Sequence, residues 1–160
     1  MSRLRPARPG ELQLKAVSVW WTSRGRRYRD EVLFVTLEDP GVVDGRVAED
    51  LAELVADPTH IVVPDAVHES LAERFDRVEY GLGFCGPGLG EPGERGCRNA
   101  GATRRGFNRA QFGDRARVRL LDRSGGDAFR VVSVEDGPGA DWRSEVRTVD
   151  FEALHADHGL

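Results

Sequence analysis

The sequence predicts an α+β fold, a mixed sheet with small helices packed on it. Three observations support this prediction. Short runs rich in Val and aromatic residues recur along the chain, two pairs of such runs flank glycine-containing turns, and two amphipathic stretches lie between runs in the middle of the chain. Together they predict two β-hairpins around a central β-α-β-α-β segment.

Length and composition limit the organisation of the chain. With 160 residues, 39% hydrophobic and 31% charged, we expect a single domain spanning residues 1–160. No apolar run approaches the roughly 18 residues that a membrane span needs. The basic N-terminus lacks an apolar signal segment, and two cysteines are too few for a disulfide framework. We therefore expect a cytoplasmic protein without membrane contact, whose oligomeric state the sequence leaves open.

The first predicted element is a hairpin with an arginine-rich tip. Residues 11–23 and 30–39 read as strands, and the turn between them carries arginines from Arg24 to Arg29. Trp20 and Trp21 are adjacent in the first strand, so their side chains must point to opposite faces. We expect one of them in the core.

The central segment is predicted to alternate helices and strands. Apolar residues spaced for one helix face predict a helix over 44–57, "THIVVP" predicts a buried strand over 59–64, and a second helix is expected within 64–76. Residues 77–84 read as a further strand. This order favours parallel strands joined by right-handed crossovers.

A long Gly/Arg-rich loop is predicted over about 81–114, followed by the second hairpin over 116–136 and a last short helix that Asp150 caps. A short helix near 108–112 is an option within the loop. The loop contains the pattern G-x-G-x-x-G at Gly81, Gly83 and Gly86. Prolines that follow prevent the helix which a dinucleotide site needs, so we expect a surface loop and no cofactor.

The two cysteines of this loop, Cys85 and Cys97, allow several interpretations. A cytoplasmic location argues against a disulfide between them. With His155 and His158 they would complete a four-ligand metal set, although their spacing is not that of a known zinc motif. Cys85 would serve as a nucleophile if a histidine base lay in reach. We favour two unreactive thiols, and the other interpretations remain open.

Charge is sorted along the chain. Residues 3–29 carry eight basic groups against one acidic group, residues 95–119 carry the same excess, and residues 30–80 carry a net charge of −11. Guanidinium groups bind phosphate and carboxylate oxygens in bidentate geometry. If the two basic blocks meet in space, they form a positive face; if they pair with the chain's own acidic helices, they do not. The candidate binding residues are Arg24, Arg26, Arg27, Arg98, Arg104, Arg105, Arg109 and Arg115.

These residues predict a small, non-catalytic interaction protein. It would hold an anionic macromolecule, either a nucleic acid or an acidic protein surface, on its arginine-rich loop. The alternative is a small enzyme with Cys85 as the nucleophile and a histidine as the base. A thiolate that reacts no faster than free cysteine would argue against the enzyme, and binding that salt does not weaken would argue against phosphate recognition.

Overall fold

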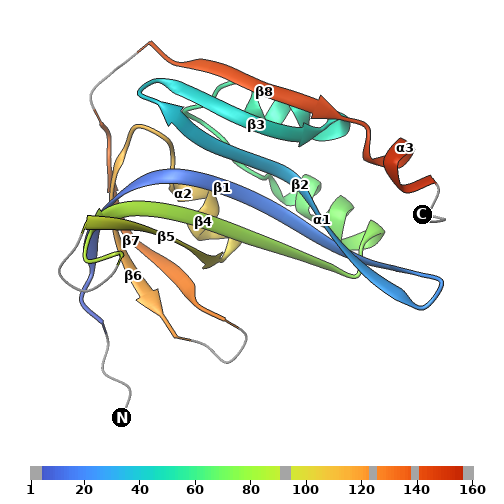
Figure 1. Cartoon of the computed structure of the whole chain (residues 1–160), viewed down its shortest axis with the longest axis horizontal. Coiled ribbons are helices and arrows are strands. Elements are labelled where there is room, and N and C mark those ends of the chain that lie inside the picture. Colours follow the sequence, from blue (N-terminus) through green and yellow to red (C-terminus); the bar gives the residue numbers. More distant parts are fainter. Residues whose placement is uncertain (1–4, 91–94, 123–125, 138–140, 157–160) are drawn as a thin grey trace.

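The chain is mostly β-structure with small helices. The computed structural model describes residues 5–90, 95–122, 126–137 and 141–156 (Figure 1). The strands are β1 (Arg8–Ser23), β2 (Arg26–Asp39), β3 (Val42–Ala48), β4 (Arg77–Pro87), β5 (Arg95–Ala102), β6 (Arg115–Leu121), β7 (Ala128–Glu135) and β8 (Arg143–Val149). The helices are the 3-10 helix η1 (Glu49–Val55) and the α-helices α1 (Asp65–Arg74), α2 (Arg104–Arg109) and α3 (Phe151–His155).

Five of the strands close into a barrel. Around the ring their order is β1-β4-β5-β7-β6, and β6 returns to β1. Neighbours are antiparallel except β5 and β7, which are parallel and joined by one residue pair, Gly101 with Ala128. The remaining strands extend the sheet from β1 in the order β2, β3, β8, and β8 runs parallel to β3.

Strand β1 belongs to both parts of the sheet. Its first residues, Arg8–Glu11, pair with β6, and its later residues, Leu14–Ser23, pair with β2 on that edge. Its other edge pairs with β4 from Glu11 to Trp20. β1 therefore forks the sheet near residues 11–14, where the barrel and the outer strands separate.

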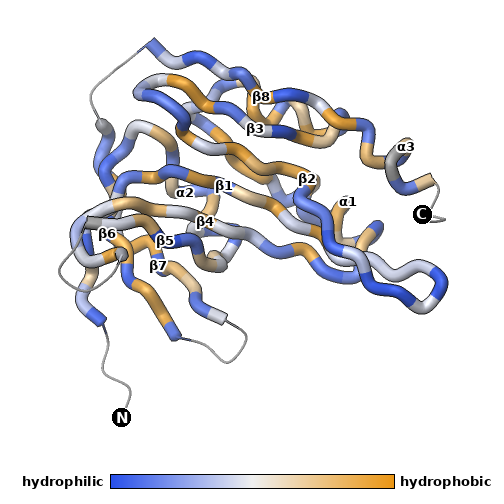
Figure 2. Tube along the Cα trace, viewed as in Figure 1, coloured by the Kyte–Doolittle hydropathy of each residue, from blue (hydrophilic) through white to orange (hydrophobic). Residues whose placement is uncertain are grey.

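The core lies inside the barrel and continues under the outer strands. Leu82 and Phe84 of β4 are fully buried, as is Phe107, which α2 inserts from one end of the barrel. Of the two adjacent tryptophans, Trp21 is 2% exposed and Trp20 is half-buried on the opposite face, as the sequence predicts. Figure 2 shows hydrophobic residues along the strand interiors and a hydrophilic β1–β2 turn.

Several predicted elements are wrong. Residues 42–48 form β3 in place of the first part of the helix expected over 44–57, and only a 3-10 helix follows. Gly45 explains the difference: its φ is +141°, and a Cβ there would lie 2.0 Å from the carbonyl oxygen of Phe34. The predicted parallel crossovers are absent from the described chain, because β4 runs antiparallel to β1. The stretch expected as a loop over 81–114 contains the end of β4, all of β5 and α2.

The strand predicted over 59–64 is an extended segment without a partner strand. Side chains supply its hydrogen bonds instead. Gln111 Oε1 accepts from the Ile61 amide at 2.8 Å, and Asn108 Oδ1 accepts from the Val63 amide at 2.8 Å. Lys15 Nζ donates to the Ile61 carbonyl at 2.6 Å. The apolar run is buried as predicted, but α2 and the residues after it take the place of a neighbouring strand.

Candidate anion-binding site

The predicted binding arginines fall into two separate regions. Arg24, Arg26 and Arg27 lie at the tip of the β1–β2 hairpin, beyond the end of β4 (Figure 1). Arg115 pairs with Glu11 at the other end of β1. At about 3.3 Å per residue, the twelve residues from Glu11 to Ser23 separate these regions by roughly 40 Å. The structure does not bring the two basic blocks onto one surface.

Two arginines of the central block are engaged by the chain's own carboxylates. Arg98 forms an ion pair with Asp127, and Arg104 forms one with Asp65. Arg104 also donates to the carbonyl of Val63 at 2.9 Å. These guanidinium groups hold β5 and α2 against neighbouring segments, so they are structural in this arrangement.

The other arginines of α2 line a pocket, which we call the arginine pocket. Its cavity volume is about 450 Å³, and it lies between α2 and the β6–β7 hairpin. The lining includes four arginines and, among the described residues, no carboxylate. They are Arg105, Arg109, Arg119 and Arg130.

The four guanidinium groups come together through regular secondary structure. Arg105 and Arg109 are four residues apart on α2, and therefore share one face of that helix. Arg119 of β6 and Arg130 of β7 are directly paired across the hairpin. Two like charges destabilise a fold slightly when they lie four residues apart on a helix or directly opposite each other on paired strands. A bound anion would remove that repulsion.

Within the described chain, none of these four side chains forms an ion pair with a carboxylate. Arg109 donates to the carbonyl of Val131 at 3.2 Å, and Arg119 donates to that of Arg5 at 2.8 Å. These bonds orient the side chains while leaving their positive charge uncompensated. The pocket thus presents oriented donors that suit phosphate or carboxylate oxygens.

A shallow groove, which we call the sheet groove, adjoins the arginine pocket on the outer face of β1, β4 and β5. Its cavity volume is about 350 Å³, and Ser18, Gly81 and Asn99 are among its lining residues. Gly101 and Asp127 of this groove lie two residues from Thr103 and Phe129 of the pocket. An extended ligand can therefore pass from one into the other along the surface.

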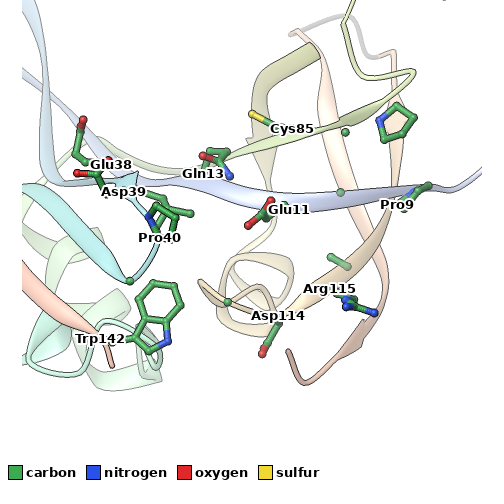
Figure 3. A pocket seen from close by; sticks show the side chains of 17 residues that line it. Pro9, Glu11, Gln13, Glu38, Asp39, Pro40, Cys85, Asp114, Arg115 and Trp142 are labelled. Carbon is green, nitrogen blue, oxygen red and sulfur yellow. The ribbon is translucent and has the colours of Figure 1, made fainter. Parts of the chain in front are cut away.

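Arg115 lines a different cavity. This cavity, which we call the fork cleft, lies where β6 and β2 separate along β1 and has a volume of about 650 Å³ (Figure 3). Its charged lining residues are Arg115 and four carboxylates: Glu11, Glu38, Asp39 and Asp114. Arg115 therefore lies outside the arginine pocket. Among the described residues that line the fork cleft, it is the only cation.

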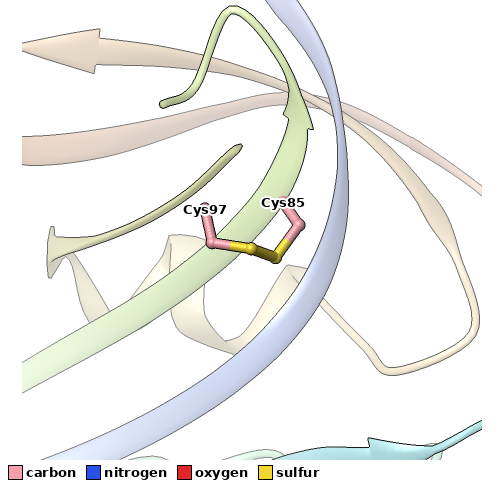
Figure 4. Close-up of a disulfide and its surroundings, with 2 residues drawn as sticks. All are labelled: Cys85 and Cys97. Carbon is pink, nitrogen blue, oxygen red and sulfur yellow. A yellow bond between two sulfur atoms is a disulfide. The ribbon is translucent and has the colours of Figure 1, made fainter. Parts of the chain in front are cut away.

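Cys85 and Cys97 are joined by a disulfide that links β4 to β5 (Figure 4). A disulfide sulfur carries no thiolate, so neither residue is a nucleophile in this state. Of the histidines considered as bases, His68 bonds to Tyr80, which lies five residues from Cys85 along β4, or roughly 16 Å. Disulfides persist mainly in oxidising compartments, so this bond does not support the cytoplasmic location that the sequence suggested.

The proposed metal set is not assembled among the described residues. His155 Nε2 lies 2.8 Å from Asp30, beside Trp21, toward the hairpin end of β1. Cys85 pairs with Glu11 near the opposite end of that strand. His158 lies outside the described residues, and no group of three or more metal-binding side chains occurs within them.

Arg119 belongs to the basic block over residues 95–119 but is not among the eight candidate binding residues, and Arg130 lies outside that block. Their alternation with buried residues places them on the outer face of the β6–β7 hairpin, but no sequence signal predicts that α2 packs beside them.

Among the described residues, no helix is long and apolar enough to cross a membrane. In comparisons with known proteins, no family model, no curated protein and no solved structure matches the chain.

Proposed function

We propose that this protein binds single-stranded nucleic acid, with the arginine pocket holding the phosphates. The observation that carries the proposal is that four arginines line one pocket with no carboxylate in its described lining. Arginine binds phosphate through two parallel N–H donors, and such contacts dominate the affinity of proteins for nucleic acid. The sheet groove gives the bases of the strand a surface on which to lie.

The connectivity of the barrel supports the same ligand class. Counted along the chain, the five barrel strands close in the order 1-2-3-5-4, with the third and fifth parallel and α2 between the third and fourth. This is the connectivity of the OB-fold, a five-stranded barrel that binds oligonucleotides and oligosaccharides. Since one fold serves many functions, this argument is by analogy and the pocket remains the primary support.

The charged residues of the groove's described lining are Arg29 and three carboxylates, Glu31, Glu79 and Asp127. Because carboxylates repel phosphates, we place the phosphates in the arginine pocket and only bases on the groove. Gly81 and Gly101 expose backbone on its floor, and Asn99 offers an amide. Its lining also includes Phe34, over which Arg46 lies at 5.1 Å from the ring centroid. Arginine and aromatic groups both stack on bases, and such stacking tolerates any sequence.

The test is binding of a fluorescein-labelled single-stranded oligonucleotide, measured by fluorescence anisotropy over a range of salt concentrations. Arg105→Ala with Arg130→Ala should weaken binding roughly 100-fold, since each lost charged contact is worth about 1.5 kcal/mol. The salt dependence should also become less steep, by about 0.7 in logarithmic slope per lost phosphate contact.

The matched control is Arg143→Ala with Arg147→Ala, which removes the same charge from β8, away from the pocket. This control should bind as the wild type does. Equal loss in both double variants would reduce the effect to net charge and contradict a defined site. Displacement of the oligonucleotide by poly-glutamate at equal charge concentration would instead identify an acidic protein surface as the partner.

A further inference from the structure

The two ends of the molecule carry opposite net charges, since the one cation in the described lining of the fork cleft, Arg115, offsets only part of the charge of its four carboxylates. At one end is the tip of the β1–β2 hairpin, which we call the basic finger and which holds Arg24, Arg26, Arg27 and Arg29. At the other end is the fork cleft, with its four carboxylates. Within the described chain, none of these eight groups takes part in an ion pair.

The basic finger is a rigid projection. Ser23 pairs with Arg26, so the turn consists of Arg24 and Gly25, with φ values of +51° and +76°. Two-residue turns with positive φ at both positions match the twist of a hairpin and fix its register. β4 pairs with β1 only as far as Trp20, so the finger extends beyond the sheet (Figure 1).

The base of the finger is held by side-chain contacts. Thr22 Oγ1 donates to Asp76 at 2.8 Å, and an Arg29 nitrogen donates to Ser18 at 2.9 Å. Arg27 lies over the Trp20 ring, 4.8 Å from its centroid. The guanidinium groups at the tip are thus displayed on an ordered support, which reduces the entropy lost when they bind a partner.

The fork cleft is suited to receive guanidinium groups. In Figure 3, Glu11 points into the space between the Pro40 loop and Asp114, while Glu38 and Asp39 lie on the side of Pro40 and the carboxylate of Asp114 points away from Glu11. The half-buried indole of Trp142 forms part of the wall. Carboxylates bind guanidinium groups bidentately, and an indole face binds cations.

We propose that the basic finger of one copy of this chain enters the fork cleft of a second copy. The arginines of the finger then meet the carboxylates of the cleft, and one guanidinium lies on Trp142. Charge complementarity between two surfaces of the same chain selects a second copy as the occupant, since the chain itself supplies both halves of the contact.

This contact is head-to-tail. The finger and the cleft lie about 40 Å apart along β1, and a hairpin on one molecule cannot reach its own cleft. An open assembly therefore keeps a free finger at one end and a free cleft at the other until a ring closes. Heterologous contacts of this kind produce closed rings or open filaments.

The experiment is sedimentation velocity of the full chain over a range of protein concentrations. In about 0.1 M salt we expect assemblies that grow with concentration, and in about 1 M salt we expect monomer, because added salt screens exposed charge pairs. Arg26→Glu with Arg27→Glu reverses the charge of two side chains of the finger. Glu11→Arg with Glu38→Arg reverses the charge of two side chains of the cleft. Each double variant alone should associate at least tenfold more weakly than the wild type.

Mixing the two variants provides the decisive result. The finger variant retains an intact cleft and the cleft variant retains an intact finger, so the mixture should form a 1:1 dimer that grows no further. A mixture that stays monomeric, or a wild type that is monomeric at every concentration in about 0.1 M salt, would overturn the proposal. All substituted residues are exposed, and far-UV circular dichroism verifies that each variant is folded.

Two controls separate this proposal from the nucleic-acid proposal. Arg105→Glu with Arg147→Glu makes the same charge change at two exposed positions outside the finger and the fork cleft and should leave association intact. Arg105→Ala with Arg130→Ala removes oligonucleotide binding in the first proposal and should not alter association. If the finger variant instead loses oligonucleotide binding and associates normally, the finger belongs to the nucleic-acid surface and self-association through it is excluded.

Discussion

Lys15, the chain's one lysine, is fully buried inside the barrel. Its Nζ donates to the carbonyls of Ile61 and Ala110 at 2.6 and 2.7 Å and lies 4.1 Å from the centroid of the Phe107 ring. Burial holds the pKa of this amine well below its ordinary value. A neutral amine still has two N–H donors, which is the number that the two carbonyls require.

The lowered pKa predicts how stability depends on pH. Between the folded and the unfolded pKa of Lys15, the unfolded chain binds a proton that the folded chain does not. The free energy of unfolding therefore rises with pH through this window and reaches its full value above the ordinary lysine pKa of about 10.4. Lys15→Met removes this contribution.

The measurement is urea unfolding of wild type and Lys15→Met at pH 7 and pH 10. The difference in unfolding free energy should shift in favour of the wild type at pH 10, while groups common to both proteins cancel. A difference that is the same at both pH values would mean that Lys15 is protonated to a similar extent in the folded and unfolded chains.

At the scale of elements, helix α2 and the residues after it act as a substitute for a strand. Asn108 accepts from the Val63 amide at 2.8 Å and donates to the Val63 carbonyl at 3.0 Å. Thr103 caps the helix by accepting from the Gly106 amide at 3.0 Å. The extended segment therefore depends on a few side chains where a strand would depend on its neighbour's backbone.

Asn108→Ala should lower the free energy of unfolding by about 1–3 kcal/mol, because it leaves the buried Val63 amide without its acceptor. Asn108→Asp keeps the acceptor but turns a carboxylate oxygen toward the Val63 carbonyl, to which the amide nitrogen donates at 3.0 Å, so it should also lower stability. Chemical denaturation at constant pH measures both. An alanine variant as stable as Arg105→Ala, an exposed control on the same helix, would contradict this account.

The limits of sequence reasoning follow from individual elements. Alternating apolar residues predict β1, β6 and β7, and a nearly continuous apolar run over residues 32–35 predicts β2. The sequence does not predict β5, because "RGCRNAGA" has no β-branched or large apolar residue. This segment takes its strand conformation from pairing with β4. The spacing of Val47 and Leu51 fits a helix as well as the observed strand followed by a 3-10 helix.

The candidate site was predicted in part. Of the predicted binding residues, Arg105 and Arg109 line the arginine pocket, whereas Arg98 and Arg104 are held in ion pairs. Residue type indicates that an arginine can bind an anion. It does not indicate which carboxylate the fold brings beside it, and that depends on long-range packing such as that of Arg104 on Asp65.

At the scale of the whole molecule, β1 joins the barrel to the outer strands. It pairs with β2, β4 and β6, so neither part retains its hydrogen bonding if β1 detaches. The buried side chains also form one continuous cluster across both parts. We therefore expect the barrel and the outer strands to unfold in a single cooperative step.

Leu33→Ala tests this expectation. Leu33 is fully buried in β2, outside the barrel, and its truncation should cost about 2–5 kcal/mol. Native-state hydrogen exchange should show the same loss for slowly exchanging amides of β4 as for those of β2. If the β4 amides keep their wild-type protection, the outer strands open independently of the barrel.

The junction of β5 with β7 gives the barrel a seam. These strands share one residue pair, whereas each of the other four junctions in the ring has at least four. Separating these two strands breaks fewer backbone hydrogen bonds than separating any other pair in the barrel. We therefore expect the barrel to open first at this junction. The Arg98–Asp127 ion pair links β5 to the residue before β7 at this junction. The arginine pocket and the sheet groove lie on either side of the junction. Loss of that ion pair would let the arginine pocket and the sheet groove move apart while the remaining strands keep their places.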